Sequence, residues 1–237
     1  MLDAALLGAV LLQLGARIAG RPSFAARLLP APRGGPPFLA WAGRLWLSFG
    51  VPSLAVLLLL GRPDALWTLP PEFASATAWA RLFGRFEPWP ILAGLALGSA
   101  LSALLAVLKL RRGGRLSHIG RPPRLPAHPR ELPAAAALAV SAGVTEELYF
   151  RLALPLLVTL VGGSAIAGVI ASAALFGAVH RYQDPVGVVA TGLVGLFLSF
   201  VHLASGALWL AMACHVAIDL NALVVRPALR FWSTGRR

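Results

Sequence analysis

The chain has 237 residues, of which 58% are hydrophobic and 13% carry a charge, about half the charged share of an average soluble domain. This composition excludes an ordinary soluble enzyme and indicates a protein embedded in a lipid bilayer. The formal net charge is +12, but the basic residues cluster in loops between apolar runs, so we expect no nucleic-acid partner. A single cysteine, Cys214, excludes an internal disulfide framework.

Seven apolar stretches are long enough to be interpreted as helices that cross a bilayer. We find neither an internal repeat nor a separate soluble domain. The sequence therefore predicts an all-α fold, a polytopic transmembrane helical bundle of about seven spans that forms one membrane domain over 1–237. Pro52 and Pro155 fall inside two of the spans and are expected to bend them. The predicted spans are 2–19, 38–60, 89–110, 133–161, 164–180, 185–202 and 206–225.

The connection 61–88 is long and rich in aromatic residues, with few charges. Two interpretations stay open for it: a short amphipathic helix on the membrane surface, or an irregular loop folded against the bundle.

Lys and Arg are distributed unevenly between the two sides that seven spans define. With the N-terminus outside, Arg62, Arg81 and Arg85 fall on the outer side, and the other loop and terminal Lys and Arg residues fall on the cytoplasmic side. The positive-inside rule therefore predicts cytoplasmic basic loops and a cytoplasmic C-terminus.

Three ionisable residues interrupt the apolar stretch 133–161. An ionised side chain near the bilayer centre costs roughly 2.5–3.5 kcal/mol on insertion scales, so such residues usually face the protein interior and mark a functional site. Glu147 and Arg151 stand four residues apart on one helix face and are expected to pair. Glu146 points about 100° away from Glu147 around the helix axis, which leaves it free for chemistry.

Later spans supply further polar groups. Phe176 and His180 share one helix face at the end of the fifth span, and His215 and Asp219 share one face of the seventh. Taken singly, His180 is typical of an interfacial histidine, and His215 with Asp219 of a hydrogen-bonded packing pair. Together with the acidic pair, they are most simply explained by one shared polar site.

The remaining histidines and the cysteine are not expected at this site. His118 and His128 fall in the basic loop 109–130, and His202 falls at the non-cytoplasmic end of its span, where we expect it to be interfacial. Cys214 neighbours His215 but points to another helix face, which disfavours a cysteine–histidine nucleophile pair.

A carboxylate with two imidazoles favours hydrolysis, because a glutamate can take a proton from water while histidines orient the water or stabilise the oxyanion. The alternative is a catalytic zinc ion, held by Glu146, His180 and His215. The His-Glu-x-x-His helix of common metalloproteases is absent, so the residue types leave both interpretations open.

These motifs resemble those of the CPBP family of intramembrane proteases, also called the Abi or type II CAAX endopeptidase family. The resemblance covers 133–225, which would be the catalytic core. The three family signatures, Glu-Glu-x-x-x-Arg, Phe-x-x-x-His and His-x-x-x-Asn/Asp, stand in family order as Glu146-Glu147-Leu148-Tyr149-Phe150-Arg151, Phe176-Gly177-Ala178-Val179-His180 and His215-Val216-Ala217-Ile218-Asp219.

The resemblance implies a role for each motif residue. Glu146 would activate the attacking water with the help of His180, while His215 and Asp219 would stabilise the oxyanion. Asp219 departs from the asparagine of well-studied relatives, so it would either be protonated or orient His215. Glu147, Arg151 and Phe176 would support the site. Relatives are described both as glutamate-dependent and as metal-dependent, and we favour catalysis without a metal cofactor.

The implied function is intramembrane hydrolysis of a peptide bond in a membrane-anchored or membrane-delivered protein. Relatives cleave prenylated CAAX tails, bacteriocin leaders or C-terminal sorting helices, the last being the work of myxosortase-like members. The composition is typical of a GC-rich bacterium, so we expect an integral protein of the bacterial inner membrane. The alternative from another class is a non-catalytic membrane scaffold or immunity protein with the same fold.

Overall fold

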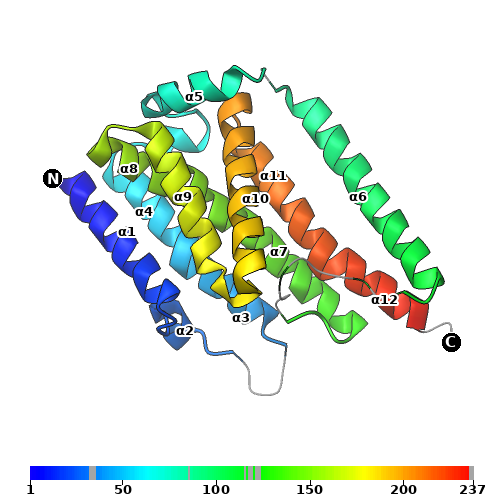
Figure 1. The fold of residues 1–237 in the computed structure, drawn as a ribbon. Helices are drawn as coiled ribbons and strands as arrows, with labels where there is room; N and C mark the ends of the chain where they lie inside the picture. The colour runs from blue at the N-terminus through cyan, green and yellow to red at the C-terminus, as the bar shows by residue number, and fades with distance from the viewer. Residues whose placement is uncertain (32–35, 85, 115, 117–119, 121–123, 235–237) are drawn as a thin grey trace.

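The computed structural model describes residues 1–237 except 32–35, 85, 115, 117–119, 121–123 and 235–237. Within the described part the chain forms helices and no strands (Figure 1), which confirms the all-α prediction. The helices are α1 (Leu2–Ile18), α2 (Phe24–Leu28), α3 (Phe38–Leu45), α4 (Val51–Leu59), α5 (Ala74–Arg81), α6 (Pro88–Arg111), α7 (Leu132–Glu147), α8 (Leu154–Gly162), α9 (Ala165–Val179), α10 (Asp184–Ser205), α11 (Leu208–Leu220) and α12 (Arg226–Thr234).

Four helical segments in the described chain are long and apolar enough to cross a membrane: Phe38–Leu59, Pro88–Arg111, Arg181–Ser205 and Leu208–Ser233. The chain is thus an integral membrane protein. The predicted spans 2–19 and 164–180 coincide with the shorter helices α1 and α9, and the span 133–161 with the continuous α7–α8 segment. The total of seven membrane spans therefore stays a prediction.

Among the described residues, three π-helical turns join helices end to end, and each one precedes a proline. They are η1 (Trp46–Gly50) before Pro52, η5 (Leu148–Ala153) before Pro155, and η7 (Asn221–Val225) before Pro227. Proline lacks a backbone N–H and clashes with the carbonyl four residues earlier. In a π turn the backbone amide bonds to the carbonyl five residues earlier instead of four. The chain therefore continues as a helix at Pro52 and at Pro155, the two prolines that were expected to bend it.

The segment α7–η5–α8 forms the centre of the bundle, with α1 and α6 at its edges (Figure 1). All six residues of η5 are buried, and α7 contacts α3 and α11. The contact between α7 and α11 is very close, because a Cβ atom on Gly143 would lie 2.7 Å from the backbone nitrogen of Val216. This close approach brings the Glu146–Glu147 pair and His215 within reach of each other.

The connection 61–87 combines features of both open interpretations. It contains the short helix α5 and two 3₁₀ turns, η2 (Pro63–Leu66) and η3 (Pro71–Phe73), and Phe73 is fully buried against the bundle. Trp67, Trp79 and Phe83 are exposed. A hydrogen bond from Arg62 holds the pKa of the Glu72 carboxyl below its ordinary value.

Candidate active site

The last turn of α7 carries both glutamates into the interior of the bundle. Glu146 is 5% exposed and Glu147 is fully buried. Buried carboxylates in a helical membrane protein need polar or cationic partners, and the partners of the two glutamates differ.

Glu147 is held by a cation from its own helix and by a histidine from α11. Its Oε2 lies 3.0 Å from Nε of Arg151, which is the expected ion pair, and its Oε1 accepts a hydrogen bond from Nδ1 of His215 at 2.7 Å. The spacing of four residues predicts the first contact, but no spacing predicts the second, which joins residues on two different helices.

Arg151 is buried and has few acceptors. Its contact with Glu147 is an ion pair without the alignment of a hydrogen bond, and its two terminal nitrogens have no acceptor among the described residues. The guanidinium carbon lies 4.4 Å from the centre of the Phe176 ring, a cation–π contact that is strongest when water is excluded. Phe176 is the supporting residue predicted from the second motif, and its ring therefore packs on Arg151, the cation of the first motif.

Glu146 faces two imidazoles. Its Oε2 lies 3.9 Å from Nε2 of His180 and 4.0 Å from Nε2 of His215. Nδ1 of His180 is 2.7 Å from the carbonyl oxygen of Phe176, so this nitrogen carries the proton, and in the neutral ring Nε2 presents a lone pair to Glu146. Each separation is one that a single bridging water can span.

Asp219 lies at the edge of the same cluster. Its Oδ2 is 3.7 Å from Nε2 of His215, beyond hydrogen-bonding distance, and its side chain is 28% exposed. Glu147, and not Asp219, holds the His215 ring. The structure thus brings together all seven residues singled out in the three motifs: Glu146, Glu147, Arg151, Phe176, His180, His215 and Asp219.

The donor types suit a zinc ion, and their separations are longer than those around a bound zinc ion. Bonds of 2.0–2.2 Å in a tetrahedral site would bring a coordinated nitrogen and oxygen to about 3.3–3.6 Å of each other, and the separations between Glu146 and the two imidazoles are 3.9 and 4.0 Å. Within the described part of the chain, no group of three His, Cys, Asp or Glu side chains could hold a metal ion in this arrangement.

His202 corrects one expectation from the sequence. We expected it to be interfacial, but its side chain is 2% exposed and faces the ring of Phe73 edge-on. No spacing along the sequence predicts this burial, because it depends on how α10 packs against its neighbours.

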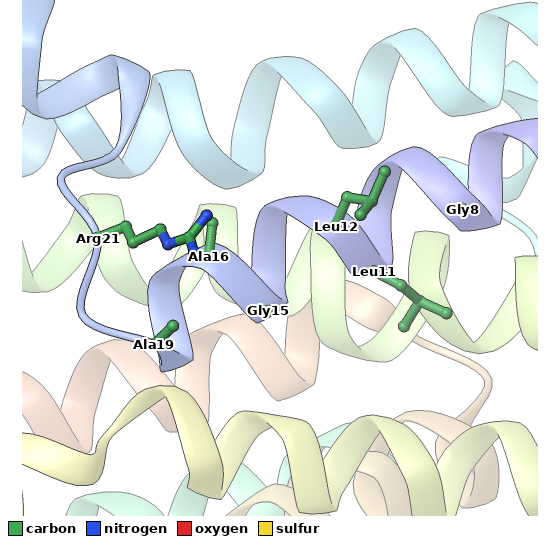
Figure 2. Close-up of a pocket in the computed structure, with 7 residues that line it drawn as sticks. All are labelled: Gly8, Leu11, Leu12, Gly15, Ala16, Ala19 and Arg21. Atoms are coloured by element: carbon green, nitrogen blue, oxygen red, sulfur yellow. The ribbon is translucent and has the colours of Figure 1, made fainter.

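His128 and Cys214 lie outside the cluster. His128 is exposed, and His118 lies outside the described residues. Cys214 packs in an apolar cluster of α10 and α11. Figure 2 shows a hollow along α1, and none of the motif residues lines it; its lining residues are Gly8, Leu11, Leu12, Gly15, Ala16, Ala19 and Arg21.

The fold and the cluster define a helical membrane protein with an acid–imidazole site inside the bundle. Residues 128–221 match the family model described as type II CAAX prenyl endopeptidase, Rce1-like. This family belongs to CPBP, and all three motifs fall inside the matched residues. The match supports an endopeptidase in general and confirms the family resemblance; the myxosortase-like subtype stays a prediction. No curated protein and no solved structure matches the chain.

Proposed function

We propose that this protein is a glutamate-dependent intramembrane endopeptidase that cleaves a membrane-anchored or membrane-delivered protein. The observation that carries the proposal is the pair of imidazole Nε2 atoms that face the single Glu146 carboxylate inside the bundle. Glu147 is occupied by Arg151 and His215, so Glu146 is the carboxylate available to a water molecule.

In the proposed reaction, Glu146 takes a proton from a water molecule positioned by His180, and the water oxygen attacks the scissile carbonyl carbon. Glu146 then passes this proton to the departing amine nitrogen as the peptide bond breaks. His215, protonated on both nitrogens, donates Nδ1–H to Glu147 and Nε2–H to the oxyanion. Asp219, when protonated, supplies a second donor on the same side.

The substrate reaches this site from the bilayer, since the glutamates lie within a bundle of apolar helices. A substrate held in the membrane by a hydrophobic tail or lipid group would enter laterally between helices. The basic loops would lie in the cytoplasm by the positive-inside rule, in the inner membrane of a bacterium.

The geometry of the site favours hydrolysis without a metal ion. The separations between Glu146 and the imidazoles match a bridging water better than a shared zinc ion. If zinc did bind, Glu146, His180 and His215 would hold it, and it would supply a Lewis acid and a bound nucleophilic water.

The test uses the purified protein in liposomes with a fluorogenic peptide that ends in a CAAX sequence, with and without a farnesyl group on its cysteine. We expect the wild type to cleave the peptide, Glu146→Gln to lose cleavage while keeping its fold, and 1,10-phenanthroline to leave the wild-type rate unchanged. Inhibition that zinc reverses would replace the metal-free reaction with the metal-dependent one. Equal cleavage rates for wild type and Glu146→Gln would contradict the proposed role of Glu146. Absence of cleavage in both would favour the scaffold or immunity function.

A further inference from the structure

The turn between α9 and α10 is held in place by contacts with both α1 and α10. It is the 3₁₀ turn η6 (Arg181–Gln183), which follows the last motif residue of α9 directly (Figure 1). Arg181 donates a hydrogen bond to the carbonyl of Ile18, the last residue of α1. Thr191 of α10 donates its hydroxyl to the side-chain oxygen of Gln183 at 3.1 Å. The first and last residues of the turn are therefore both fixed.

A strained backbone position follows this turn. Asp184 has φ of 70° and ψ of 172°, and it is the one non-glycine residue with positive φ in the described part of the chain. Such a conformation is costly, persists only where its surroundings maintain it, and is typical of functional sites. Here the Asp184 carboxylate accepts a hydrogen bond from the amide of Gly187 at 3.0 Å. A Cβ atom on Gly187 would lie 2.5 Å from that of Gln183, so glycine is needed for this close approach.

Tyr182 stands between the two fixed residues and beside the candidate active site. Its ring centre lies 5.7 Å from that of His180, with 44° between the ring planes. Its hydroxyl oxygen accepts a hydrogen bond from the side-chain amide of Gln183 at 3.3 Å. A chain of hydrogen bonds thus runs from Thr191 through Gln183 to the phenol of Tyr182, and it fixes where this phenol lies.

The phenol keeps a donor for an incoming partner. Among the described residues, nothing accepts the hydroxyl proton of Tyr182, and the residue is 50% exposed. A buried tyrosine hydroxyl usually finds its partner within the protein, whereas this one is held at the surface next to an imidazole of the site. A peptide substrate carries a carbonyl acceptor at every residue, so it offers the acceptor that the protein does not.

We propose that Tyr182 is a substrate-binding residue of this site, which donates its hydroxyl proton to a backbone carbonyl of the bound peptide next to the scissile bond. The inference rests on the proposed endopeptidase function, because it names a contact with the substrate of that reaction. Since this carbonyl is not the one attacked, its bond to Tyr182 is equally strong before and during the reaction. Loss of the bond should therefore change KM and leave kcat as it is.

The test deletes one hydroxyl. Tyr182→Phe keeps the ring beside His180 and removes only the donor. We expect KM for the farnesylated fluorogenic peptide to rise about fivefold, the order expected for one lost hydrogen bond, with kcat unchanged. Tyr149→Phe is the matched control, because it removes the hydroxyl of the chain's other tyrosine, which contacts the Val10 carbonyl at 3.4 Å. This control should leave KM unchanged.

Gln183→Leu tests the chain of hydrogen bonds that holds the phenol. This variant should also raise KM, because the hydroxyl of Tyr182 is no longer held in place. The double variant Tyr182→Phe/Gln183→Leu should have the KM of Tyr182→Phe alone, since Gln183 acts through that hydroxyl. A KM raised by the product of the two single effects would contradict this arrangement.

A binding measurement separates failure of this inference from failure of the endopeptidase function. It uses fluorescence anisotropy of a labelled farnesylated CAAX peptide in nanodiscs, with protein-free nanodiscs as the blank. In a Glu146→Gln background, adding Tyr182→Phe should raise Kd about fivefold. The proposal is overturned if Tyr182→Phe changes neither KM nor Kd, if it lowers kcat with KM unchanged, or if the peptide does not bind. If the wild type binds the peptide but cleaves nothing, the endopeptidase function fails, and Kd still decides whether Tyr182 holds the peptide.

Discussion

Glu147 is the more constrained of the two glutamates, since it is fully buried and held on both oxygens by groups from its own helix and from α11. Its neutralisation would leave the Arg151 cation buried without a counter-charge. We expect Glu147→Gln to destabilise the fold by about 3–5 kcal/mol, as for one partner removed from a buried ion pair, measured as a lowered unfolding temperature in detergent. Glu146→Gln is the matched control, because Glu146 lies 3.9 and 4.0 Å from its two imidazoles, beyond hydrogen-bonding distance. Equal unfolding temperatures for the two variants would contradict the anchoring role of Glu147.

Substitutions of Asp219 test whether the reaction needs a hydrogen-bond donor beside His215. In our proposal the protonated carboxyl donates to the oxyanion, and an asparagine amide can do the same. Asp219→Asn should therefore keep kcat within about threefold of wild type, while Asp219→Ala should lower it roughly 10²-fold, as for loss of an oxyanion donor. A similar loss in both variants would show that the reaction requires a carboxylate at this position. The measurement is kcat on the farnesylated peptide.

At the level of elements, the close contact between α7 and α11 sets the distance between the glutamates and His215. The methyl group of Gly143→Ala would meet backbone atoms of Val216, which cannot rotate away. We expect this variant to lose about 1–3 kcal/mol of stability through overpacking and to lose cleavage as α7 moves away from α11. Unfolding temperature and kcat are both measured.

Gly98→Ala is the control for this prediction. Gly98 lies on the helix α6 at the edge of the bundle, and a Cβ atom added there would have no heavy atom within 4 Å, so the same substitution should leave cleavage intact. A loss of cleavage in Gly98→Ala equal to that in Gly143→Ala would contradict the packing argument.

Spacing along one helix is what made the first motif recognisable in the sequence. The pairing of Glu147 with Arg151 follows from a separation of four residues and is present in the structure. The bond between Glu147 and His215 joins residues 68 positions apart, and the burial of His202 depends on the packing of α10. Neither follows from periodicity. The prolines indicated interrupted helices, but the side chains that bond to backbone carbonyls of the two turns, Gln13 to that of Ser48 and Ser172 to that of Phe150, could be identified only once the helices were packed.

For the whole molecule, the uneven distribution of Lys and Arg predicts which side of the bilayer each loop faces. In a Cys214→Ser background, we expect a cysteine at Arg112 to react with a membrane-impermeant maleimide only in inverted vesicles, and a cysteine at Arg62 only in right-side-out vesicles. Labelling of both positions from the same side would contradict the predicted topology, since α6 separates them.

The central claim is that this bundle hydrolyses an internal peptide bond with Glu146. The most direct measurement is mass spectrometry of an anchored peptide after incubation with wild type and with Glu146→Gln in liposomes. Our account predicts one internal cut by the wild type, with two fragments whose masses sum to the substrate plus one water, and an intact peptide with the variant. Stepwise trimming from either end, or the same fragments with Glu146→Gln, would contradict it.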